Sequence, residues 1–167
     1  MLLKIFNGPA PTTAVQAAVT TGTAIKTLLQ VKNFNAMKVV AWGISFDGAA
    51  AAAGVQCELL TTGTVFATVT AHADADITRW AGSGTDTVPS VAGLTLGTSA
   101  TGYTASAEGS ITATDVLDCQ IVQPTGQYVY EFSLGREPKI TVGDALRIRV
   151  DAVAAVNAVC WVLVDIG

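Results

Sequence analysis

The sequence is poor in the groups that carry acid–base chemistry. Only 13% of its 167 residues are charged, well below the roughly one quarter typical of soluble domains, and His72 is its only histidine. General acid–base catalysis needs such groups close together, so the composition argues against an enzyme. Mean hydropathy is +0.48, and a chain with so few charges must cover apolar surface, most simply against a partner subunit.

Basic residues are scarce as well. Nine Lys and Arg against thirteen Asp and Glu give a formal net charge of −4 and a pI of about 4.7. Nucleic-acid binding needs clustered Lys and Arg, so we expect no nucleic-acid partner. No apolar run is long enough to cross a bilayer as a helix, and residues 1–6 lack the apolar stretch and cleavage site of a signal peptide. We therefore expect no membrane association and a cytoplasmic origin.

Motifs for metals, cofactors and nucleophiles are missing. The chain has three widely spaced cysteines, Cys57, Cys119 and Cys160. They form no CxxC pair, and we predict buried free thiols. Asp74, Asp76 and Asp86 lack the glycine and distal glutamate of a calcium loop, so we interpret them as solvated acids. We expect no metal and no cofactor.

An enzyme would have to use His72, which lies in a segment that is loop-like by composition. Ser45, in Gly43-Ile-Ser-Phe-Asp47, lacks the second glycine of a nucleophile elbow and falls within an expected strand. Loss of an activity on replacing His72 would be needed to support a hydrolase.

Alternating apolar residues bounded by turn residues predict short strands and no amphipathic helix. The expected strands are residues 2–6, 23–31, 38–47, 55–60, 65–70, 103–108, 119–122, 128–132, 146–150 and 156–166, and residues 138–144 are expected to carry a turn at Gly143-Asp144. We predict one all-β domain over 1–167, a two-sheet, jelly-roll-like β-sandwich of about 8–10 strands.

Several strands carry finer predictions. Residues 55–60 and 65–70 are expected to form a hairpin around Thr62-Gly63. The last strand is expected to be central or covered on both faces, and Trp42 and Trp161 are expected in the core. Two strands show alternating faces. Val40, Trp42, Ile44 and Phe46 share one face, and Leu146, Ile148 and Val150 alternate with Arg147 and Arg149 as a half-buried strand.

Two segments break the strand pattern. Residues 7–22, the arm, contain Pro9 and Pro11 and read either as an extended arm that lies on a neighbouring subunit or as a surface loop. Residues 71–101 form a long loop that is either a functional excursion or hides short strands such as 93–96.

Candidate interface residues lie in and near these segments. Arg79 and Trp80 are residue types enriched in binding hot spots, and they either contact another subunit or fold back on their own core. Arg136 ties a turn together with Glu137 or contributes to an interface. The predicted interface set is Pro9, Pro11, Thr12, Thr13, Arg79, Trp80 and Arg136.

Four segments carry a family resemblance: 132–138 (FSLGREP), 142–149 (VGDALRIR), 42–48 (WGISFDG) and 124–128 (PTGQY). They resemble small β-sandwich proteins of tailed-bacteriophage structural modules, and most closely a capsid decoration, or cement, protein. The resemblance implies a non-catalytic homotrimer on the outside of the head. Such a protein is assembled in the host bacterial cytoplasm and clamps neighbouring major capsid proteins.

Two alternatives stay open. One is another phage structural protein, from the tail or neck. The other is a β-sandwich module that binds a carbohydrate or receptor through Trp80, Tyr103, Tyr128 and Tyr130.

Overall fold

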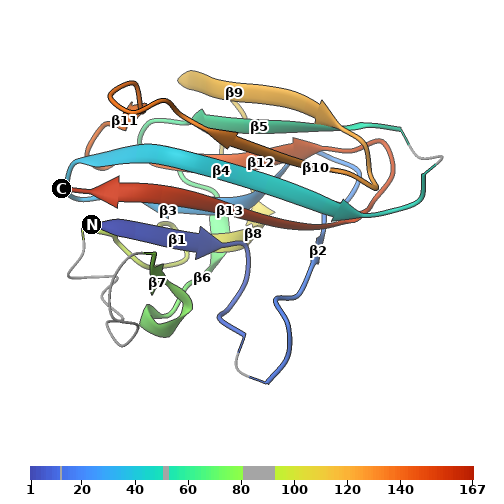
Figure 1. The fold of residues 1–167 in the computed structure, drawn as a ribbon, viewed down its shortest axis with the longest axis horizontal. Helices are drawn as coiled ribbons and strands as arrows, with labels where there is room; N and C mark the ends of the chain where they lie inside the picture. Colours follow the sequence, from blue (N-terminus) through green and yellow to red (C-terminus); the bar gives the residue numbers. More distant parts are fainter. Residues whose placement is uncertain (12, 51–52, 81–92) are drawn as a thin grey trace.

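The chain folds into two antiparallel sheets that pack face to face (Figure 1). The computed structural model describes residues 1–11, 13–50, 53–80 and 93–167. Its strands are β1 (Leu2–Phe6), β2 (Val19–Thr20), β3 (Lys26–Lys32), β4 (Met37–Asp47), β5 (Val55–Thr61), β6 (Thr68–Ala71), β7 (Thr78–Arg79), β8 (Gly102–Ala107), β9 (Asp115–Val122), β10 (Gln127–Glu131), β11 (Lys139–Ile140), β12 (Ala145–Asp151) and β13 (Asn157–Ile166). The predicted all-β, two-sheet sandwich is confirmed.

Sheet A has the strand order β10-β4-β13-β1-β7, with β2 paired to β13 and β11 paired to β4. Sheet B has the order β6-β8-β3-β12-β5-β9. The central position predicted for the last strand is confirmed, because β13 lies between β4 and β1. Residues along β13 alternate between buried and half-buried or exposed, since only one face of this strand packs on sheet B.

The core lies between the two sheets and is built from the side chains that point inward from each sheet. Leu3 and Ile5 of β1, Val162 of β13 and Ile148 of β12 are all nearly inaccessible to solvent. Burying such a side chain contributes roughly 1.5–3 kcal/mol to folding.

A β-bulge in β4 changes which residues share a face, so the predicted face of this strand is wrong at Val40. The pairing with β13 skips from Ala41 to Val39, so Val40 is an extra residue. The core side chains are therefore Trp42, Ile44 and Phe46 on one side of the bulge and Val39 on the other. Val40 is only half-buried and does not share their face.

The predicted hairpin between 55–60 and 65–70 is wrong. β5 pairs with β12 and β9, while β6 pairs with β8. Gln30 explains the different path, because its buried side-chain amide exchanges two hydrogen bonds with the backbone of Ala67 and donates a third to the carbonyl of Ala100. These bonds hold the chain after Thr62 against β3 instead of letting it return along β5.

The described parts of the middle loop contain short elements. A 3-10 turn, η1 (Asp74–Asp76), precedes β7, and Leu94 and Leu96 make isolated bridges to Asn33 and Thr101. Residues 81–92 lie outside the described residues. Of the short strands expected in this segment, β7 is present in its first part, whereas residues 93–96 contain only the two isolated bridges.

Candidate interaction surface

The arm is held at both of its ends. The Asn7 side chain is fully buried, donates to the carbonyl of Ala158 and accepts from the backbone N–H of Cys160, at 3.1 and 2.9 Å. At the other end the Thr21 hydroxyl accepts from the N–H of Val156 at 3.1 Å. Between Asn7 and β2 the chain projects away from both sheets as a long loop, and β2 then pairs with β13 just before Thr21 (Figure 1). The arm is thus a closed loop with a fixed base.

The tip of this loop is exposed and uncharged. Pro9, Pro11 and Thr13 are exposed, and 89% of Val15 is accessible to solvent. Thr12, also predicted as an interface residue, lies outside the described residues. No charged residue occurs between the two anchors. Such a loop loses little hydration free energy when a partner covers it, because it has no charge to desolvate.

The structure brings the arm and the Trp80 region together. The backbone N–H of Ala10 donates to a carboxylate oxygen of Asp76 in η1, at 2.8 Å. Trp80 follows Asp76 by four residues, and its backbone N–H donates to the carbonyl of Leu2 in β1, at 2.9 Å. The arm, η1 and Trp80 therefore lie along the β1–β7 side of sheet A, and the two regions predicted separately form one surface.

An aromatic cluster continues this surface onto the outer face of sheet A. The ammonium group of Lys4 lies 4.0 Å from the ring centroid of Trp161, 4.4 Å from that of Trp80 and 5.4 Å from that of Phe6. Burial lowers the pKa of Lys4. Trp161 was predicted in the core, and that prediction is wrong: its ring covers the small residue Gly43 on the outer face. Trp80 remains 56% exposed.

The two predicted arginines lie in different places. Arg79 is half-buried on β7, paired with Leu3 of β1 and with Nε 3.2 Å from the Met1 sulfur, and it precedes Trp80 in the chain. Arg136 is exposed in the turn after β10, at the opposite side of sheet A. In that turn the N–H of Gly135 donates to the Glu137 carboxylate, and backbone N–H groups lower the pKa of that carboxyl. Arg136 is therefore not part of the arm surface.

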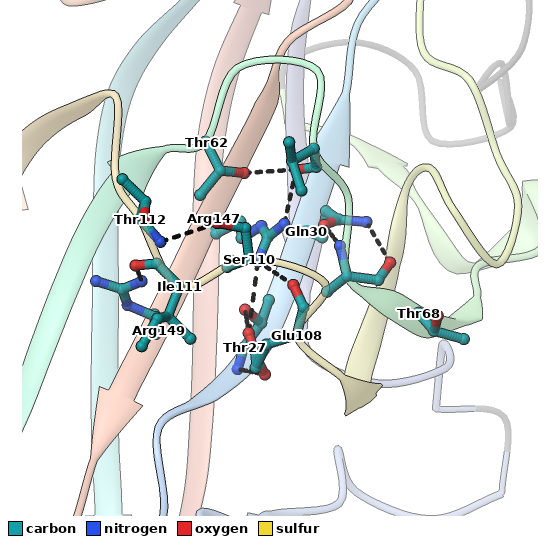
Figure 2. A network of polar contacts seen from close by, with 12 residues as sticks. Thr27, Gln30, Thr62, Thr68, Glu108, Ser110, Ile111, Thr112, Arg147 and Arg149 are labelled. Carbon is teal, nitrogen blue, oxygen red and sulfur yellow. Dashed lines mark hydrogen bonds and ion pairs between the residues drawn. The ribbon is translucent and has the colours of Figure 1, made fainter.

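A buried polar network fastens the β8–β9 connection to the outside of sheet B (Figure 2). The Arg147 side chain is 0% exposed and donates to the carbonyls of Val65, Glu108 and Ser110. The Glu108 carboxylate lies 3.4 Å from Arg147 and also accepts from the N–H and hydroxyl of Thr27. The network is a structural brace for a segment without strand pairing.

Arg149 adds a second tie in the same network. It forms an ion pair with Glu58 at 2.8 Å and donates to the carbonyl of Ile111. The strand 146–150 was predicted to be half-buried, with its arginine face open to solvent. That prediction is wrong, because both Arg147 and Arg149 are covered. The alternating pattern contained no signal that a distant loop would cross this face.

The candidate catalytic residues do not converge. His72 is 3% exposed, with Nε2 2.9 Å from the carbonyl oxygen of Phe6 and its ring edge-to-face with Tyr103. Burial lowers the pKa of His72, which favours the neutral ring. The Ser45 hydroxyl lies on β4 and points to the carbonyl of Val159. His72 was expected in a polar loop by composition and is instead a buried residue that packs against Tyr103.

The described candidate calcium ligands, Asp74 and Asp76, do not form a common site. The Asp76 carboxylate accepts from the backbone N–H of Ala73 and from the arm, so it closes the η1 turn. Asp74 is exposed, and Asp86 lies outside the described residues. Within the described ranges, no three His, Cys, Asp or Glu side chains gather as metal ligands.

The aromatic residues considered for sugar stacking are dispersed. Tyr128 donates to the Asp118 carboxylate at 2.9 Å, and the indole N–H of Trp42 donates to the same oxygen at 3.0 Å. Burial and this hydrogen bond raise the pKa of Tyr128 to about 12. Tyr130 stacks beside Tyr128 on β10, at the opposite side of sheet A from Trp80. These rings form no common platform.

The cysteines follow the prediction in two cases out of three. Cys57 and Cys160 are buried free thiols, and burial raises the pKa of Cys57 to about 12 and that of Cys160 well above its usual value. Cys119 is exposed on the edge strand β9, so the prediction for this residue is wrong.

One hollow of about 460 Å³ lies near β11, lined by Met37, Ile140, Val142 and their neighbours. It contains none of the predicted interface residues. Within the described residues no helix is both long enough and apolar enough to span a membrane. The chain matches no protein-family model, no curated protein and no solved structure.

Proposed function

We propose that this chain is a non-catalytic structural protein of a bacteriophage virion. It binds the outside of the head and stabilises the capsid by clamping neighbouring major capsid proteins. The observation that carries the proposal is the arm surface: an uncharged, solvent-exposed loop with an anchored base, next to an exposed Trp80. The family resemblance supplies the identity of the partner.

The arm surface suits adhesion to a repetitive protein lattice. Its base is fixed by buried hydrogen bonds, so the loop loses less conformational entropy on binding than a free tail would. A homotrimer, which the resemblance implies, would present three such loops. Several weak contacts made at once then give high avidity. The protein would be assembled in the host cytoplasm and remain on the capsid surface.

Co-sedimentation with phage heads that lack this protein tests the proposal. The arm variant replaces residues 9–18 with a Gly-Ser linker of equal length and keeps the anchors Asn7 and Thr21. We expect this variant to stay folded and to lose binding at least ten-fold, and Trp80→Ala to weaken binding by about 1–2 kcal/mol. Normal binding by a folded arm variant would show that the arm is not the contact.

A matched control separates the arm from general surface effects. Leu134→Ser removes a side chain that is 96% exposed at the opposite side of sheet A. We expect it to bind heads like the parent protein. A glycan array tests the sugar-binding alternative in parallel, and hits that disappear with Trp80→Ala would favour it over capsid binding.

A further inference from the structure

The outer face of sheet A, which points away from sheet B, carries apolar residues in its middle and polar or charged residues around them. The strand registers align Phe6, Trp161, Gly43 and Val129 in one row across β1, β13, β4 and β10. Of this row, Val129 is 58% exposed. Phe6 and Trp161 are half-buried and Gly43 lies beneath the Trp161 ring, so the accessible part of this row is formed by the two aromatic rings and Val129.

The neighbouring row carries one charge at each end. It contains Lys4, Leu163, Ala41 and Glu131, in that order across the same four strands. Among the described residues, no carboxylate lies within ion-pair distance of Lys4, and no cation within that distance of Glu131. Two opposite charges, without an ion-pair partner in this part of the chain, thus lie about three strand spacings apart, roughly 14 Å, with Leu163 and Ala41 between them.

We propose that two copies of this chain pair through the outer face of sheet A. The two-fold axis runs parallel to the strands, between β13 and β4. This rotation exchanges the two ends of each row. Lys4 of each copy therefore faces Glu131 of the other copy, which gives two equivalent charge pairs. Leu163 then lies on Ala41 of the second copy, a large residue against a small one.

The next row is complementary only at its two inner positions under the same rotation. It contains Leu2, Asp165, Lys38 and Lys139, so Asp165, which also holds the Met1 amino group at 2.7 Å, faces Lys38 of the second copy, and Leu2 faces Lys139. A two-fold axis across the strands would instead stack the first charged row on itself and oppose the two Lys4 side chains. The charges therefore select one orientation, as expected for an isologous interface.

The size of the face sets the expected affinity. Four strands about 4.8 Å apart and about seven residues long give roughly 19 by 23 Å, about 440 Å² per copy. A standard interface buries about 800 Å² per partner. We therefore expect a concentration-dependent dimer with a dissociation constant on the order of 10–100 µM. This pairing does not need the arm, but it gives a two-fold dimer in place of the homotrimer that the resemblance implies, and its face lies next to Trp80.

Sedimentation velocity over a concentration series tests the pairing on the full chain. We expect the mass to rise from 17.1 kDa toward about 34 kDa between about 5 and 500 µM. Lys4→Glu and Glu131→Lys should each raise the dissociation constant at least ten-fold. The double variant, which restores opposite charges across the axis, should return it to within about three-fold of the parent value.

Lys32→Glu is the matched control. Lys32 lies on sheet B with its ammonium 4.6 Å from the Phe66 ring centroid, so this variant has the same charge change and also loses a cation–π contact. It should dimerise like the parent. A parent that stays monomeric at every concentration, or a trimer that Glu131→Lys leaves intact, would overturn the proposal. A double variant whose dissociation constant is as high as that of the single variants would also overturn it. Glu131 is exposed, so its replacement should not disturb the fold.

Discussion

Replacing Arg147 with methionine should release the β8–β9 connection from sheet B. The guanidinium is completely buried and donates to three backbone carbonyls, and it faces the Glu108 carboxylate, whose side chain is 17% exposed. Methionine fills much of the same volume and leaves these acceptors without a donor. Breaking a buried pair by removing one member costs about 3–5 kcal/mol. For a chain of this length that loss lowers Tm by roughly 6–20 °C.

Urea unfolding followed by tryptophan fluorescence measures this loss. The midpoint should fall and the slope should decrease slightly, because releasing the connection exposes surface already in the folded state. Arg136→Met makes the same chemical change in an exposed turn and should shift stability by less than about 0.5 kcal/mol. A loss below about 1 kcal/mol for Arg147→Met, the value of an exposed ion pair, would refute the claim that the network braces this segment.

Three further predictions concern single groups. Because the pKa of Tyr128 is raised to about 12, the free energy of unfolding should fall as pH rises from 10 to 12. In a tyrosinate absorbance titration, Tyr128→Phe should remove the transition that occurs at the highest pH. Because the pKa of His72 is lowered, its contribution to stability should be complete above pH 6.5 and decline below it; an NMR titration of this single histidine giving a pKa of 6.5 or higher would contradict its burial. In native protein at neutral pH one thiol should react rapidly with a disulfide reagent, and Cys119→Ser should abolish this reaction; an unchanged rate would mean that Cys57 or Cys160 is accessible.

Local pattern predicted most of the strands because alternation is a local property. Residues 2–6 form β1 with the expected bounds, and the last strand is central as expected. The bulge at Val40 could not be read from alternation, since both neighbours of the extra residue are apolar. Trp161 was assigned to the core because it is a tryptophan on a strand, although its alternation with Cys160 and Val162 places it on the opposite face.

The remaining errors come from contacts between distant segments. The burial of Arg147 depends on a loop 39 positions earlier in the chain, and the failed hairpin depends on the amide of Gln30, 37 positions before Ala67. The candidate surface was predicted as two separate pieces, the arm and Trp80. The hydrogen bond from Ala10 to Asp76 joins them, and no sequence motif marks that bond.

Electron cryo-microscopy of phage heads mixed with the purified protein tests the central claim most directly. The proposed function predicts added density at repeated positions on the outer head surface, with the loop between Asn7 and Thr21 and the Trp80 side in contact with the major capsid protein. Heads without added density, or density only at the neck or tail, would contradict it.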